Sequence, residues 1–221
     1  MNPKHALSGA ALLVAAVVAF PAFAQRSTPI SAPPARYSLL GGTTVPNGVD
    51  VVSAEVGWPS ATFGLTHGMS STTDIGFKFD LIWGFEDTTI GQFGLGFRVP
   101  LRSNILRRDR FTALVHIDPG IKVYTTSPAN FGIQFPVGAT LAYAAAPEWN
   151  VGFGVELPMT LMVTPSPVRF FLGPLFGPEI EYHVDRQLTV GLNSRFGPVF
   201  NTNSGASEFG LIMQALLAYR L

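Results

Sequence analysis

Four long segments of this chain alternate, residue by residue, between an apolar side chain and a small or polar one. The segments are residues 91–102, 131–143, 151–163 and 209–221. On one face of them every residue except Gly91 is apolar, and on the other face the only large apolar residues are Met162, Ile212 and Leu216. A period of two is that of a β-strand whose two faces meet different surroundings. The chain is therefore expected to be all-β.

The length of these segments separates two kinds of β protein. Each has 12 or 13 residues, whereas a soluble strand usually has about 5–6 and a tilted transmembrane strand needs about 9–11. The sequence therefore predicts an antiparallel transmembrane up-and-down β-barrel. The ten candidate strands are residues 49–58, 61–67, 74–85, 90–102, 111–125, 131–144, 149–163, 168–182, 187–200 and 208–221. If residues 49–67 form one strand, another at 37–45 keeps the number even, and counts from eight to twelve stay open.

The tryptophan and tyrosine residues fall near the ends of these strands, while the strand centres carry Phe, Leu and Val. Trp and Tyr prefer the membrane–water interface, and a soluble sandwich has no reason to sort its aromatic residues in this way. The predicted interface aromatics are Trp58, Trp83, Tyr143, Trp149, Tyr182 and Tyr219. The alternative is a soluble periplasmic β-barrel or sandwich that binds an apolar ligand.

The first 24 residues have the features of a secretory signal peptide. Lys4 precedes an apolar run at residues 10–20, and Ala22-Phe23-Ala24 matches the small-x-small cleavage rule. The run is too short for a comfortable membrane helix of about 20 residues. We therefore expect signal-peptide-dependent export of the chain.

The remaining residues divide into two parts. Residues 25–48 are interrupted by prolines and are predicted to be a flexible periplasmic lead-in, although residues 37–40 could form a short strand or lie inside a cavity. Residues 49–221 are then the barrel domain.

Six prolines fall inside the candidate strands: Pro119, Pro136, Pro158, Pro174, Pro178 and Pro198. A closed barrel has no edge strand, so each proline removes a ladder hydrogen bond. We expect a bulge or bend beside each one.

The last 13 residues, 209–221, resemble the C-terminal assembly signal of bacterial outer-membrane β-barrel proteins. In that family, alternate apolar residues end in an aromatic residue that the barrel-assembly machinery reads. This chain ends in Leu221, and Tyr219 supplies the aromatic residue two positions earlier. The resemblance implies a small barrel without assigned function in the cell outer membrane. It implies outer-membrane lipids and the assembly machinery as partners, and no catalytic residue.

Continuing the alternation places charged residues of both signs on the inner face of the barrel. The predicted lumen-lining residues are Glu55, Lys78, Asp80, Arg98, Arg102, Asp118, Lys122, Glu156, Arg169, Glu179, Glu181, Arg195, Glu208 and Arg220. Many inward neighbours are glycines, which leave room for long side chains from across the barrel. Two interpretations follow: a structural barrel filled by ion pairs, or a narrow passive pore with weak ion selectivity.

Composition and motifs exclude several other functions. Fourteen basic and 14 acidic residues balance, which argues against a nucleic-acid binder. There is no cysteine for a disulfide or a thiolate metal site. His116-x-Asp118 and Glu179-x-Glu181-x-His183 could in principle bind a metal or transfer protons, but membership of an ion-pair network explains them as well. Neither an enzyme activity nor a cofactor or metal is expected.

Overall fold

The computed structural model describes residues 37–163 and 167–221, which belong to one compact unit, residues 34–221. The predicted signal peptide lies outside the described residues. The strands are β1 (Asp50–Trp58), β2 (Ser60–Gly68), β3 (Thr73–Gly84), β4 (Gly91–Arg98), β5 (Leu101–Arg108), β6 (Phe111–Ile117), β7 (Gly120–Tyr124), β8 (Asn130–Gln134), β9 (Val137–Ala144), β10 (Trp149–Leu157), β11 (Met159–Met162), β12 (Arg169–Leu172), β13 (Leu175–His183), β14 (Leu188–Asn201) and β15 (Ser207–Arg220). Within these ranges no helix is long and apolar enough to cross a membrane.

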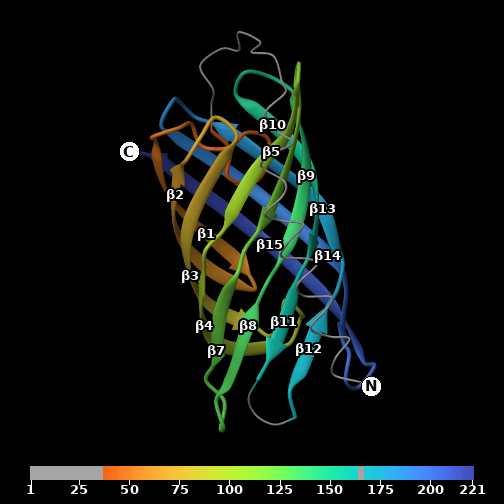
Figure 1. The fold of residues 1–221 in the computed structure, drawn as a ribbon. Helices are drawn as coiled ribbons and strands as arrows, with labels where there is room; N and C mark the ends of the chain where they lie inside the picture. Colours follow the sequence, from red (N-terminus) through yellow and green to blue (C-terminus); the bar gives the residue numbers. More distant parts are fainter. Residues whose placement is uncertain (1–36, 164–166) are drawn as a thin grey trace. The chain divides into compact units, whose positions relative to one another are not determined.

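All 15 strands belong to one antiparallel sheet (Figure 1), in the order β12-β11-β8-β7-β4-β3-β2-β1-β15-β14-β13-β10-β9-β6-β5. Two further pairings, β12–β14 and β3–β5, join strands that are distant in this order. With them, the path β12-β11-β8-β7-β4-β3-β5-β6-β9-β10-β13-β14 returns to β12 and forms a ring of 12 strands. The first strand, β1, pairs with the last, β15, from Val51 and Arg220 to Trp58 and Met213.

Prolines divide the long segments without changing their register. In the β5–β6 pair Leu101 faces Ile117, and three residues further along each segment Arg98 of β4 faces Gly120 of β7. The ladder therefore continues in step past Pro100 and Pro119. The recorded register shifts lie between Ile82 and Gly84 and between Asn104 and Leu106. The expected bulge is therefore wrong at Pro119, and Pro100 causes none either. At both prolines the strand keeps its register and lacks only the N–H of the proline.

The two faces of the sheet differ in the way the alternation predicts. Large apolar side chains such as Phe97, Phe153 and Leu217 are about half exposed on one face. On the other face charged and polar residues such as Asp80 and Glu181 are buried. We call this second face the inner face. A soluble protein shows the reverse arrangement, since it hides apolar side chains and exposes charged ones.

Residues 37–45 lie against the inner face, and we call them the inner segment. The Tyr37 hydroxyl donates to the carbonyls of Gln187 and Ala218, at 2.7 and 3.2 Å. Tyr37 and Val45 are 2% and 0% exposed and pack with Val51 of β1. Burial raises the pKa of the Tyr37 phenol above its ordinary value. The inner segment thus differs from the flexible lead-in expected for residues 25–48, because the sheet supplies partners for its main chain.

At the opposite end of the strands, the β3–β4 loop folds over the inner face. Thr88 forms a β-bridge with Gly210, and its carbonyl accepts the indole N–H of Trp58 at 3.0 Å. Phe85 of this loop packs against an apolar cluster. The cluster consists of Ile82, Tyr124, Met162, Phe171, Leu175, Val199 and Ile212. Apolar groups therefore cover both ends of the inner face, and charged residues lie between them.

Candidate functional site

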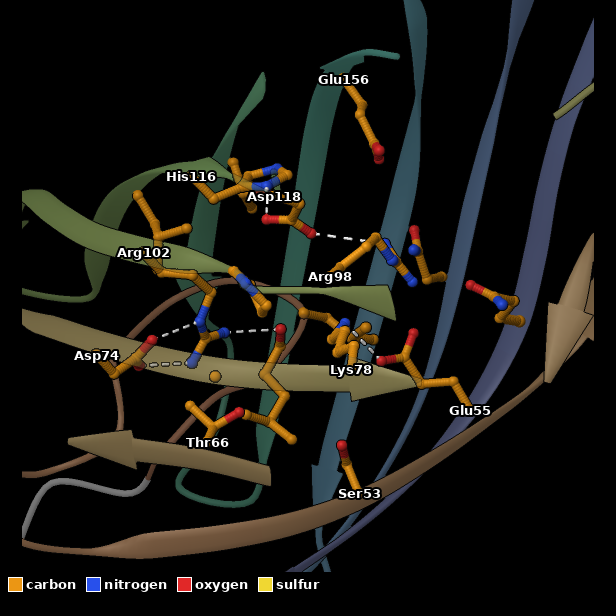
Figure 2. Close-up of a pocket in the computed structure, with 18 of the residues that line it drawn as sticks. Ser53, Glu55, Thr66, Asp74, Lys78, Arg98, Arg102, His116, Asp118 and Glu156 are labelled. Carbon is orange, nitrogen blue, oxygen red and sulfur yellow. Dashed lines mark hydrogen bonds and ion pairs between the residues drawn. The ribbon is translucent and has the colours of Figure 1, made fainter. Parts of the chain in front are cut away.

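Charged side chains from different strands meet on the inner face (Figure 2). Lys78 of β3 donates to Glu55 of β1, with Nζ and Oε1 2.8 Å apart. Strand β2 lies between these two strands, so the pair reaches across it. Gly64 of β2 leaves space on this face: a Cβ there would lie only 2.6 Å from Ser53 Oγ and in ordinary contact with Lys78 Cγ, at 3.5 Å.

The longest connected group of charges is centred on Arg98 of β4. Its Nε and Nη2 donate to the two carboxylate oxygens of Asp80, at 2.8 and 2.6 Å. Its Nη1 lies 3.6 Å from Asp118 Oδ2, and Asp118 Oδ1 is 3.1 Å from His116 Nδ1. Thr62 donates to Asp80 as well, at 2.6 Å. A bidentate guanidinium–carboxylate pair fixes the orientation of both groups, so Arg98 links β4 to β3 and also lies beside the carboxylate that contacts His116.

A second ion pair joins β5 to β3. Arg102 donates from Nε and Nη2 to the two oxygens of Asp74, at 2.8 and 2.6 Å. Asp74 is 0% exposed. The remaining donors of Arg102 point to main-chain carbonyls of the inner segment, at Ser38 and Leu39.

A third ion pair replaces part of the β13–β14 ladder. Arg195 of β14 pairs with Glu179 of β13, and its Nη1 donates to the carbonyls of Ser194 and Gly177, each at 2.9 Å. The recorded ladder pairs Phe176 with Phe196 and next Glu179 with Asn193, and it leaves out the two positions between. Pro178 at one of them lies opposite Ser194 and has no N–H to donate. The guanidinium thus gives the Ser194 carbonyl a donor in place of the missing N–H.

The remaining charges lie toward the two covered ends. Lys122 of β7 contacts Glu86 of the β3–β4 loop, with Nζ 3.3 Å from Oε2. Glu181 of β13 accepts hydrogen bonds from the Ser38 hydroxyl and from the N–H groups of Leu39 and Leu40. Glu156 points into the pocket in Figure 2, and the described residues give it no hydrogen bond or ion pair.

Two small cavities lie between these charged side chains. The larger, about 100 Å³, lies between the inner segment and the Arg98 cluster, and Leu39, Lys78 and Arg102 line it. The smaller, about 60 Å³, lies on the side of Lys122 and Tyr124. Both are lined by Arg98, Glu156, Ile212 and Gln214. These four side chains therefore form the partition between the two cavities.

Glycines make room for the long side chains. A Cβ at Gly154 would lie 2.0 Å from Arg195 Nη2, and one at Gly138 would lie 2.2 Å from His116 Nε2. Both distances are shorter than any contact a real side chain makes. The inward glycines of β9 and β10 thus define where the charged groups of β14 and β6 can lie.

Most of the charged residues predicted to face inward do meet there. The predicted residues that take part in these contacts are Glu55, Lys78, Asp80, Arg98, Arg102, Asp118, Lys122, Glu179, Glu181 and Arg195. Glu156 faces the cavities. Arg169 and Arg220 lie half-buried at strand ends, with the Arg169 guanidinium 6.0 Å from the Phe171 ring centre. Glu208 is exposed at the start of β15 and does not reach the cavities.

Sequence reasoning missed two carboxylates, Asp74 and Glu86. Both share the even numbering of Lys78 and Asp80, so the same alternation could have placed them inward. Asp74 is the first residue of its candidate strand, and Glu86 lies one residue beyond that strand's end. Glu179, Glu181 and His183 do not form one site, because each has a different partner. His183 Nδ1 lies 2.9 Å from the Thr189 hydroxyl. In the described chain, no group of three or more His, Asp or Glu residues could hold a metal ion.

The predicted interface aromatics lie at both ends of the strands. Trp149 and Tyr182 contact each other at one end, with ring centres 4.6 Å apart and ring planes tilted by 42°, and the ring centres of Tyr143 and Phe111 lie 4.9 Å apart nearby. Tyr219, in the predicted assembly signal, is 44% exposed at the same end, and Leu221 is exposed beyond it. Trp58 and Trp83 lie half-buried at the opposite end.

No protein-family model matches the sequence, and no curated protein matches it. Among solved structures, the outer membrane protease OmpT from Escherichia coli is similar, with a TM-score of 0.44 and 10% identity. The match covers 85% of this chain and 100% of that one. At this identity no residue role is carried from the protease to this chain.

Proposed function

We propose that this chain is a small outer-membrane β-barrel whose lumen is filled by ion pairs. In this proposal β4–β5, β6–β7, β8–β9, β10–β11 and β12–β13 are five continuous membrane-crossing segments, each interrupted by prolines. Together with β1, β2, β3, β14 and β15 they make ten, an even number as in bacterial single-chain barrels. The predicted signal peptide supports export to that membrane.

The outer face of the sheet is the observation that carries the proposal. Followed through the register from strand to strand, its outward residues include Leu217, Ala54, Phe63, Phe79, Phe97, Ile121, Ile133 and Leu161. This row crosses eight strands without a charged side chain. Soluble monomers rarely expose a contiguous apolar patch of more than a few hundred Å². Acyl chains are the surroundings in which such a face is stable, and this argues against the soluble barrel or sandwich.

The covered ends and paired charges favour a structural barrel that does not conduct in this form. The inner segment lies at one end and the β3–β4 loop at the other. A narrow passive pore is the second candidate, because only the partition of Arg98, Glu156, Ile212 and Gln214 separates the two cavities. Planar-bilayer recording distinguishes the two: silence supports the filled barrel, and steady single-channel steps support the pore.

A matched pair of substitutions tests the membrane location of the outer face. Phe97→Arg places a charge near the middle of the β4–β5 segment and is expected to cost about 2–4 kcal/mol of folding free energy. Phe200→Arg makes the same change one residue from the end of β14 and is expected to cost about 0–1 kcal/mol. Urea titration of the protein folded into lipid vesicles measures both.

The control for this experiment is the behaviour of the parent protein. A membrane barrel is expected to need detergent or lipid and to migrate differently on gels before and after heating. Equal small costs at Phe97 and Phe200, or a parent that stays folded in water alone, would overturn the proposal.

A further inference from the structure

We propose that the inner face beside the inner segment is a binding site for a short bent peptide, which the chain fills with its own residues 37–45, where Ser38 N–H donates to the Thr43 carbonyl at 3.0 Å. The site needs the folded sheet but not its insertion in a membrane, so the proposal stands apart from the proposed function. Its ligand class is a peptide main chain, recognised through its N–H and C=O groups.

Arg102 and Glu181 bind one end of the segment from two different strands. Arg102 of β5 donates to the carbonyls of Leu39 and Ser38, at 2.7 and 3.0 Å. Glu181 of β13 accepts the N–H groups of Leu39 and Leu40, at 2.8 and 3.1 Å. Both side chains thus contact main-chain atoms, which any residue at these positions would offer.

Asp74 and Asn104 bind the other end in the same way. Asp74 of β3 accepts the N–H of Val45 at 2.7 Å, and Asn104 of β5 donates to the carbonyl of Gly42 at 2.8 Å. Asp74 and Asn104 are 0% and 2% exposed. Buried polar groups that lose their partners cost about 1–3 kcal/mol each. An empty site would therefore leave several unsatisfied groups unless water or another peptide replaced the segment.

Two glycines give the site its sequence requirement. A Cβ at Gly41 would lie 1.8 Å from Glu179 Oε1 and 2.3 Å from Thr140 Cγ2. Gly42 has a φ of +97°, a conformation that residues with a side chain rarely adopt. Tyr37 and Val45 are buried at the two ends of the segment. The ligand is thus a Gly-Gly peptide with an aromatic residue four positions before the first glycine and a small apolar residue three after the second.

The occupant also separates the larger cavity from one end of the strands. Leu39 and Leu40 line that cavity together with Arg102 and Asp74. Release of the segment would join the cavity to the end of the sheet where β1 begins. The site therefore couples peptide binding to access into the lumen.

Cysteine protection in the full chain tests the binding geometry, since the sequence has no cysteine of its own. Val45→Cys is expected to resist a maleimide reagent in the folded protein, whereas the exposed Asn47→Cys reacts at once. Adding Gly41→Val or Asn104→Ala to Val45→Cys is expected to speed its labelling at least tenfold. Unchanged labelling in both variants, with the heat-dependent gel shift intact, would overturn the site.

Exchange distinguishes a binding site from permanent core packing. A protease site inserted at the exposed Asn47-Gly48 turn of the full chain allows the segment to be cut free after folding. A fluorescent peptide of residues 36–47 is then expected to replace the cut segment with saturable binding, and the same peptide with Gly41→Val is not. No exchange, or equal binding of both peptides, would refute the proposal. The Phe97 and Phe200 variants report separately on the membrane.

Discussion

Arg195 offers the sharpest test of how the inner face stabilises the sheet. Arg195 is 5% exposed, pairs with Glu179 and donates to the Ser194 carbonyl where the β13–β14 ladder has no recorded pair. Arg195→Met removes both functions at similar side-chain volume. Breaking a buried ion pair by removing one partner costs about 3–5 kcal/mol, and most of this cost is the Glu179 charge left alone.

A second variant separates the contribution of the unpaired Glu179 charge from that of the lost hydrogen bond to the main chain. In the double variant Arg195→Met with Glu179→Leu, neither charge of this pair remains, and such replacements are often neutral. The Ser194 carbonyl still lacks its donor, so a loss of about 1–3 kcal/mol is expected to persist. The assay is urea unfolding in lipid vesicles, followed by tryptophan fluorescence and by gel migration. A single variant that loses under about 1 kcal/mol would show that the pair does not form, and full recovery in the double variant would show that the carbonyl does not depend on Arg195.

Two further predictions concern single carboxylates. Asp74→Asn is expected to cost about 3–5 kcal/mol of folding free energy in the same urea titration, because it leaves buried Arg102 without its counter-charge. Glu156→Gln breaks no ion pair and is expected to be neutral or slightly stabilising. The opposite ranking of the two variants would contradict the assigned partners. Asp185 lies in the exposed turn after β13, and hydrogen bonds from the N–H groups of Leu188 and Gln187 hold its pKa below the usual range. Its contribution to stability is thus present at neutral pH and lost as the pH falls through the lowered pKa, so Asp185→Ala is expected to flatten the acid side of a stability–pH curve, and an unchanged curve would argue against the turn.

The alternation of side chains predicted the strands and their faces because period two is a property of the sequence itself. Phe97, Phe153 and Leu217 are exposed, and Lys78, Asp80 and Arg98 meet, as that pattern requires. The ten segments of the proposal also follow the candidate strands closely. The short connections between these segments contain turn residues, which can be recognised from the local sequence.

The partners of each charge could not be predicted from the sequence. Arg98 reaches Asp80 and Asp118 because of the stagger between neighbouring strands, and nothing in one strand's sequence specifies that stagger. The position of the inner segment has the same origin. Its hydrogen bonds join Leu39 to Glu181 over 142 positions of sequence, and a local pattern contains no information about such a distant contact.

The pairing of β1 with β15 can form only when the last strand is present. The inner segment precedes β1, and its partners Asp74, Arg102 and Glu181 are drawn from the early, middle and late parts of the chain. Contacts so far apart in sequence form slowly. Once β1 and β15 have paired, a peptide can reach the site only through the end of the sheet where β1 begins. We therefore expect the segment to be bound before β15 pairs with β1, so that later exchange is slow and passes through that one end.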